Sequence, residues 1–189
     1  WGHWPVIVAT LVWLHRSDRR GYPILRNALC LSGAIGLVIF AAYAVAPPRL
    51  MPLGLIDTVT EQSHSYRVLQ PPALVNKYAA VPSLHVGWNL LIGIALWRAS
   101  RNRILRALAV TGPVLMAIAV VVTANHYVVD GMVGAAVALT GLTLSGRITP
   151  RLVAVDARLR ARLRPPVTRL SLPARFGGAA VRDREQQST

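Results

Sequence analysis

Long stretches without a charged residue constrain this chain more than any other feature. The ranges 27–48 and 107–127 hold 22 and 21 residues without Asp, Glu, Lys or Arg, and the ranges 81–97 and 131–146 hold 17 and 16. A helix that crosses the hydrocarbon core of a bilayer needs about 20 mostly apolar residues. A soluble protein with four such stretches would have almost no polar surface to present to water. The sequence therefore predicts a membrane protein that crosses the bilayer several times.

The apolar stretches predict an all-α fold, a polytopic transmembrane helix bundle over residues 1–147. The first segment is short and is interpreted as the end of a helix whose start is missing. Pro113 lies inside the predicted segment 104–125, where neighbouring helices can satisfy the carbonyl that a proline leaves free. Five membrane segments are predicted, at about 3–15, 26–47, 82–98, 104–125 and 127–146.

The basic residues predict how the chain is oriented in the membrane. A net charge of +14 is typical of a nucleic-acid-binding protein, but 53% apolar residues is not, so no nucleic-acid partner is expected. Arginines concentrate in the loops at 16–26 and 98–106 and in the tail from 147 onward, which all fall on one side if the five segments cross the bilayer. Excess Lys and Arg marks the cytoplasmic side. We therefore expect the 47–81 loop and the 126–130 turn to face outward from a multi-pass cell-membrane protein.

The residues after the last segment, 148–189, are expected to form a basic cytoplasmic tail. Leu152, Val155, Leu159 and Leu163 have helical spacing and alternate with arginines, which predicts an amphipathic helix at about 150–164 that binds anionic lipid. A disordered charged tail that only sets the topology is an equal alternative. After the Pro165-Pro166 pair the composition indicates disorder.

Three ionisable residues are predicted at the outer ends of helices. His126 and Asp130 are four residues apart, so on a continuous helix they would share a face. A carboxylate so placed can hold one imidazole nitrogen and stabilise the charge that develops when the other attacks an electrophile. His85 follows Pro82 and Ser83 at the predicted start of the third segment, where free N–H groups favour an anion such as phosphate. A purely structural His–Asp pair is the alternative.

Basic residues in the outer loop are candidates to bind that phosphate. Arg49 follows two prolines at the outer end of the second segment, and its guanidinium suits a bidentate contact with phosphate oxygens. A simple interfacial anchor is the alternative interpretation. Lys77 and Arg67 are further candidates by position in the loop alone.

At these residues the sequence resembles the type 2 phosphatidic acid phosphatase superfamily, which carries the motifs KxxxxxxRP, PSGH and SRxxxxxHxxxD. Pro82-Ser83-Leu84-His85 is similar to the second motif, with leucine in place of glycine, and His126 and Asp130 match the third. The arginine of the third motif would fall at Val120 and is absent, and only Arg49 remains of the first. The forms PSLH, HYxxD and PPRL look more like the branch that contains the inositol phosphorylceramide synthases. Members have six core helices, which implies that this chain lacks one helix and part of another at its start.

The resemblance implies a phosphoester mechanism that needs no metal and no cofactor. His126 would attack phosphorus and form a phosphohistidine, Asp130 would orient it, and His85 would protonate the leaving alkoxide. Arg49 and Ser83, with Lys77 as a possible substitute for a missing cation, would bind the phosphate of a membrane lipid or polyprenyl-type substrate. Loss of expected cations would suit a less charged diester, which favours head-group transfer over monoester hydrolysis.

Two other functions use the same residues. A small transporter could use them as a proton relay, but it would need polar groups through the depth of the helices, and here these are almost purely apolar between their ends. A metal site would need three or four ligands, of which His64 would have to supply one.

Overall fold

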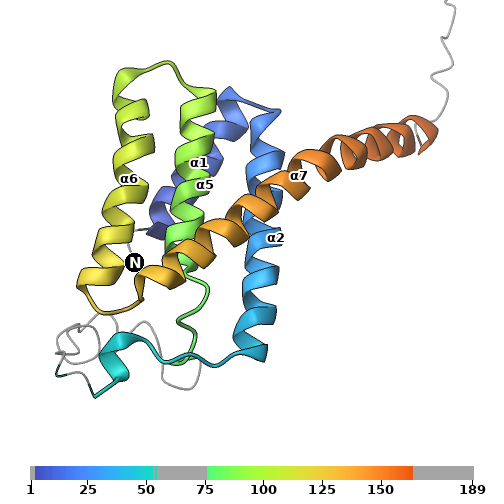
Figure 1. The fold of residues 1–189 in the computed structure, drawn as a ribbon. Helices are drawn as coiled ribbons and strands as arrows, with labels where there is room; N and C mark the ends of the chain where they lie inside the picture. The colour runs from blue at the N-terminus through green and yellow to red at the C-terminus, as the bar shows by residue number, and fades with distance from the viewer. Residues whose placement is uncertain (1–2, 53, 55–75, 164–189) are drawn as a thin grey trace, which may run out of the picture. The chain divides into compact units, whose positions relative to one another are not determined.

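The computed structural model describes residues 3–52, 54 and 76–163, and these residues form an all-α bundle, as predicted. The only β pairing within them is a single bridge between Val45 and Ala79. The elements run in the order α1 (His3–Ser17), α2 (Gly21–Ala42), the short 3-10 helix η1 (Pro48–Leu50), α5 (Leu84–Ala99), α6 (Arg103–Val122) and α7 (Val128–Leu163) (Figure 1).

Among the residues that the structure describes, three helices are long and apolar enough to cross a membrane by length and composition. These are α2, α6 and the part of α7 over Val128–Asp156. The other two predicted segments are also helical, but α1 and α5 have 15 and 16 residues, fewer than the predicted spans need. These helices therefore indicate a membrane protein, and the orientation of the chain in the bilayer stays a prediction.

Helix α2 begins and ends about five residues earlier than the predicted segment 26–47. It begins early because the Asp18 carboxylate accepts the backbone N–H of Gly21 at 2.9 Å, as a residue before a helix start often does. It ends early because the following residues are extended: the Val45 N–H donates to the Tyr78 carbonyl at 2.7 Å, and the Ala80 N–H donates back to the Val45 carbonyl at 3.1 Å. The segment after α2 is thereby joined to the segment before α5.

Helix α7 runs without a break from Val128 to Leu163, with Pro150 inside it. The predicted membrane segment 127–146 and the predicted tail helix 150–164 are therefore one helix. The chain divides into two compact units, 1–154 and 155–189. Leu152, Val155 and Leu159 are exposed, and their binding to anionic lipid stays a prediction. The predicted disorder after the proline pair lies outside the described residues, as do Arg67 and His64.

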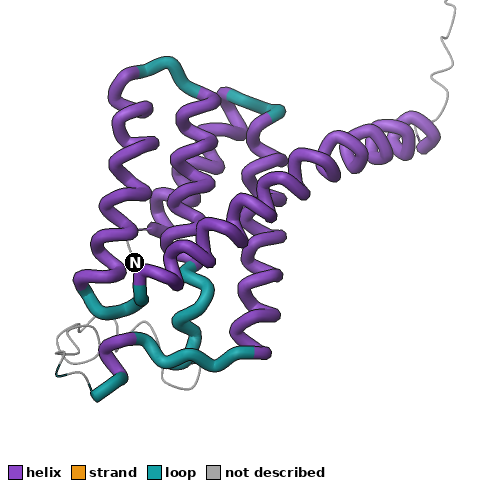
Figure 2. The backbone as a smooth tube through the Cα atoms, in the orientation of Figure 1, coloured by secondary structure: helices purple, strands orange, loops and turns teal. Residues whose placement is uncertain are grey.

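Helix α5 lies between α1, α2 and α6 in the first unit (Figure 2). Helix α7 crosses α2 in a close contact, where the Ser145 hydroxyl donates to the Ile24 carbonyl at 2.7 Å and the Asn27 amide donates to Thr149 Oγ1 at 2.9 Å. Such bonds between helices stabilise membrane bundles by roughly 0.6 kcal/mol each. The buried apolar core comprises Ile7, Leu14, Leu25, Ala28, Leu29, Leu91, Ile92 and Ala138.

The connections that carry the candidate residues lie at one end of this unit. The segment 43–52, the segment 76–83 and the α6–α7 loop at 123–127 are together at the lower end of Figures 1 and 2. The α1–α2 and α5–α6 connections lie at the opposite end. The prediction likewise placed the α1–α2 and α5–α6 connections on one side and the other two connections on the opposite side. The arrangement brings distant parts of the sequence together at one site.

Candidate active site

His126 lies in the loop between α6 and α7, so it does not share a continuous helix with Asp130. Helix α6 ends at Val122, and the N–H groups of Asn125 and His126 both donate to the Val120 carbonyl at 3.0 Å. Asp130 is in the first turn of α7, where its Oδ2 accepts the Tyr127 N–H at 2.8 Å. The two side chains still meet, with His126 Nδ1 and Asp130 Oδ2 3.6 Å apart.

The closest partner of the His126 ring is the backbone carbonyl of Ala80. The distance from His126 Nδ1 to the Ala80 oxygen is 2.8 Å. Because a carbonyl oxygen can only accept, Nδ1 carries the proton and donates it, and Nε2 holds the lone pair. Asp130 adds its negative charge at longer range. Sequence reasoning missed Ala80 because a backbone carbonyl has no side-chain signature.

Both members of the pair are buried. The exposed fraction is 7% for His126 and zero for Asp130. Burial lowers the pKa of His126 below its usual value of 6.5, and the Ala80 carbonyl and the Asp130 charge offset this only in part. The imidazole is therefore neutral at pH 7, which leaves Nε2 free to act as a nucleophile.

His85 and Ser83 approach the pair from the start of α5. The His85 ring lies in the first turn of α5, with its centroid 5.8 Å from that of His126. Ser83 occupies the N-cap position, and its N–H donates to the Asp130 carbonyl at 2.9 Å. Within the described ranges neither Ser83 Oγ nor Asp130 Oδ1 has a hydrogen-bond partner, although both are buried. Pro82 precedes the N-cap instead of lying in the first helical turn.

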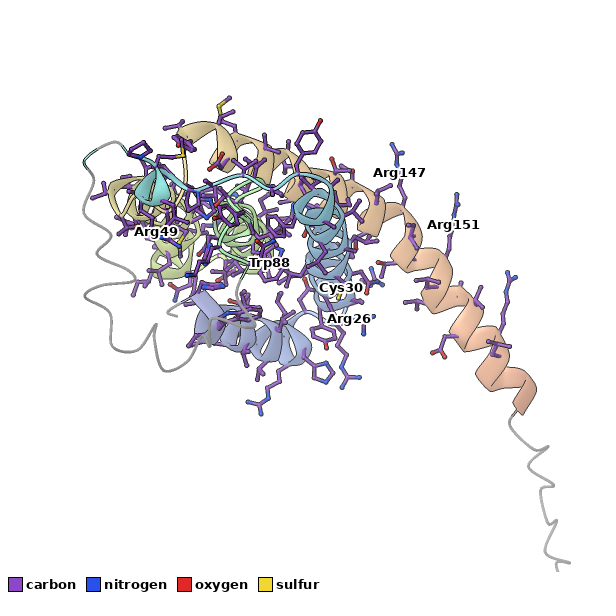
Figure 3. All side chains as sticks on the ribbon, turned by 90° about the horizontal axis from the view of Figure 1, so that it is seen from below. Arg26, Cys30, Arg49, Trp88, Arg147 and Arg151 are labelled. Carbon is purple, nitrogen blue, oxygen red and sulfur yellow. The ribbon has the colours of Figure 1, made fainter. Side chains whose placement is uncertain are left out.

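Arg49 joins the site through the α6–α7 loop. Its backbone N–H donates to the Ala124 carbonyl at 3.0 Å, and its guanidinium donates to the side-chain oxygen of Asn125. The Asn125 amide in turn donates to Thr123 Oγ1 at 2.7 Å. Figure 3, which looks onto this end of the bundle, labels Arg49. Asn125 was missed in the sequence, and its position directly before His126 was the only available signal.

Lys77 is not brought into this cluster. It lies in an exposed turn three residues before Ala80, and no contact joins it to the other candidates within the described part of the chain. Its predicted role as a substitute cation stays a prediction.

A third histidine adjoins the site from α1. The His3 ring meets His85 edge-on, with centroids 4.6 Å apart, although the sequence indicated no catalytic role for it. Within the described ranges no three His, Cys, Asp or Glu side chains are grouped so that they could hold a metal ion. The group is an imidazole nitrogen with a free lone pair, a second imidazole, a guanidinium and a helix N-terminus. This set suits attack on an anionic phosphorus centre.

Comparison with known proteins identifies the family. The family model described as the PAP2 superfamily matches residues 1–144, which include every residue of this cluster. No curated protein and no solved structure matches the chain. The match covers more than half of the sequence, and the chain belongs to the PAP2 superfamily.

Proposed function

We propose that the chain cleaves or transfers the phosphoester of a membrane lipid through a phosphohistidine on His126. PAP2 membership supports a phosphatase or phosphotransferase in general. The observation that carries the finer proposal is the contact between His126 Nδ1 and the Ala80 carbonyl, because it directs the lone pair of Nε2 away from the hydrogen-bonded edge of the ring. The nucleophile needs no separate base to remove a proton.

In the first half of the reaction, Nε2 of His126 forms a bond to phosphorus while the bond from phosphorus to the lipid oxygen breaks. His85 donates a proton to that oxygen, so the lipid leaves as a neutral alcohol. The His126 ring becomes positively charged, and the buried Asp130 carboxylate 3.6 Å from Nδ1 stabilises that charge.

In the second half, a water or an acceptor alcohol attacks the phosphorus of the phosphohistidine. His85, now neutral, takes the proton of the attacking oxygen, and the phosphorus–nitrogen bond breaks to restore His126. Water gives hydrolysis and an alcohol gives transfer. Neither half needs a metal ion or a cofactor.

Arg49, Ser83 and the first N–H groups of α5 bind the phosphate oxygens in this scheme. The hydroxyl of Ser83 supports this role because it is buried without a partner in the described residues, as a group awaiting a ligand would be. Among the residues that the structure describes, Arg49 is the one arginine joined to the loop that carries His126. A site with few cations suits a phosphodiester, so we favour head-group transfer, as in the inositol phosphorylceramide synthase-like branch, with the active site on the extracytoplasmic face.

The test is turnover of lipid phosphomonoesters and phosphodiesters, labelled at phosphorus, by the full chain in liposomes. His126→Asn should lower turnover by about 10³-fold or more. His15→Asn is the matched control, since His15 packs on Tyr22 with a ring distance of 5.0 Å, near the α1–α2 connection at the opposite end. Acid-labile, base-stable label should remain on the wild-type chain and not on His126→Asn. Retained activity in His126→Asn would refute the nucleophile, and rapid release of phosphate from a monoester without any transfer product would refute transfer.

A further inference from the structure

The His85 side chain is held at the site by contacts between rings. Within the described residues no hydrogen bond reaches its imidazole, and the bond from the Asn89 amide, at 2.9 Å, goes to its backbone carbonyl. The side chain is exposed, and an exposed side chain has more than one staggered rotamer open to it. The rings that contact it are those of His126, at a centroid distance of 5.8 Å, and His3, at 4.6 Å. The orientation of the candidate proton donor therefore depends on two other imidazoles.

The contact with His3 is the closer of the two. The His3 and His85 planes meet at 71°, edge to face, whereas the His85 and His126 planes are tilted by 57°. Edge-to-face contact is favourable for aromatic rings, because the positive edge of one ring meets the negative face of the other. His3 belongs to α1, so this contact ties the ring of His85 to a helix other than its own.

His3 is itself placed by the packing of α1 on α5. Its ring lies 5.1 Å from that of Trp4, and Trp4 meets Trp88 edge-on at 5.6 Å. The Trp88 indole N–H donates to Oγ of the fully buried Ser32 on α2, at 3.2 Å. Trp88 is about one turn after His85 on α5, so this run of rings begins and ends on the helix that carries the candidate proton donor.

We propose that His3 is a positioning residue that fixes the His85 ring in the orientation from which it donates a proton to the leaving oxygen. The inference rests on the proposed function, in which His85 is that donor. His3 acts through the shape and edge-on contact of its ring, and it neither gives nor accepts a proton. A proton donor must be within hydrogen-bond reach of the leaving oxygen, so a ring that turned freely would be in place for only part of the time.

The first test compares His3→Phe with His3→Ala in the full chain in liposomes, with a lipid phosphodiester as substrate. Phenylalanine keeps a ring that can meet His85 edge-on and has no proton to transfer, whereas alanine removes the ring. We expect kcat to fall about tenfold in His3→Ala and to stay within about threefold of wild type in His3→Phe, with KM unchanged in both. Equal losses in the two variants would overturn the proposal in favour of a proton relay through His3.

His15→Ala is the matched control for the loss of a ring contact. His15 is on the same helix and meets Tyr22 edge-on, at 5.0 Å and 73°, near the α1–α2 connection at the opposite end of the bundle. Its removal should change neither kcat nor KM. A tenfold loss in His15→Ala as well would show that α1 affects turnover only through its packing, and would overturn the assignment to His3.

The second test varies the leaving group. A para-nitrophenolate ion leaves readily without a proton, whereas an alkoxide does not, so the alkyl ester depends more on a well-placed His85. Release from each ester is followed in a single turnover, because His85 also acts in the second half of the reaction. His3→Ala should slow release of the alcohol by about tenfold and release of nitrophenolate by less than about threefold. Equal slowing of both would indicate a general distortion of the site and overturn the proposal.

A double variant tests whether His3 acts through His85. In a chain that already carries His85→Gln, adding His3→Ala should lower turnover of the phosphodiester by less than about twofold, because the residue that His3 positions is gone. A further tenfold loss would mean that His3 acts independently of His85, which overturns the proposal.

The two proposals fail in different ways. If the wild-type chain turns over no phosphate ester, or if His126→Asn stays active, the proposed function is refuted and the positioning role falls with it. If the wild-type chain is active and His126→Asn is not, but His3→Ala turns over the phosphodiester like wild type, the role of His3 alone is overturned.

Discussion

Gly134 is the position at which a single added methyl group should most disturb the site. A Cβ built there would lie 2.8 Å from the carbonyl carbon of Ser83 and 3.1 Å from its nitrogen, and closer still to its oxygen. These are backbone atoms, so they cannot rotate away as a side chain would. The Ser83 N–H also donates to the Asp130 carbonyl, which ties the same two segments together. Gly134→Ala must therefore push α7 and the start of α5 apart.

The distances give the size of the effect. Carbon atoms in favourable contact are about 3.5–4.0 Å apart, so a 2.8 Å approach calls for a displacement of about 1 Å. A misplacement of about 1 Å in a catalytic group costs about 100-fold in rate, which is about 2.7 kcal/mol of activation free energy. Overpacking lowers the free energy of unfolding by about 1–3 kcal/mol, and the better helix propensity of alanine returns about 1 kcal/mol.

Gly131→Ala is the matched control, because it makes the same exchange one turn earlier on the same helix. Its added Cβ would meet only Val86, at 3.5 Å, so it gains helix propensity without a clash. The assay is kcat/KM for a lipid phosphodiester together with the thermal midpoint in one detergent. We expect an approximately 100-fold loss for Gly134→Ala and less than about threefold for Gly131→Ala. Wild-type activity in Gly134→Ala would refute the reasoning.

Three further outcomes are expected. Since burial lowers the pKa of His126, the loss of kcat/KM at acid pH should have its midpoint below pH 6.5. Thermal stability should also fall as pH drops below 6.5, because the unfolded chain takes up that proton first. A midpoint of the acid loss of kcat/KM above pH 6.5 would contradict the kinetic prediction. Asn125→Asp should place a carboxylate on the Arg49 guanidinium and raise the Ki of inorganic phosphate by about tenfold, whereas Asn102→Asp at the α6 N-cap should not; an unchanged Ki in Asn125→Asp would exclude this coupling. Excess chelator should leave turnover unchanged, and a loss that zinc restores would favour a metal site.

The helices were largely predictable because membrane helices leave a strong local signal. The uncharged stretch 107–127 predicted a helix at about 104–125, and α6 spans Arg103–Val122. The end of α2 was not predictable in the same way. It depends on backbone bonds between Val45 and residues Tyr78 and Ala80, more than 30 positions later, and nothing in the local sequence marks that pairing.

The pairing of His126 with Asp130 was predicted from a helical spacing, and the two residues meet for a different reason. His126 precedes the helix, and the loop brings it back because the Val120 carbonyl accepts two successive N–H groups, those of Asn125 and His126. The ring is then oriented by the Ala80 carbonyl, with Asp130 further away. Residue types and spacing indicated the candidate groups, and the non-local backbone contacts decide which nitrogen of the His126 ring holds the lone pair.

The absent arginine of the third family motif can be understood from the same loop. Its position is Val120, whose carbonyl holds the His126 loop through backbone bonds that do not depend on the side chain. The Val120 side chain lines an apolar pocket between α6 and α7, so an arginine there would put a charge among apolar side chains. A guanidinium is instead joined to the loop from η1, where Arg49 donates to Asn125. Within the described residues, Arg49 is therefore the arginine joined to the loop of the candidate nucleophile, and the position of the motif's second cation is apolar.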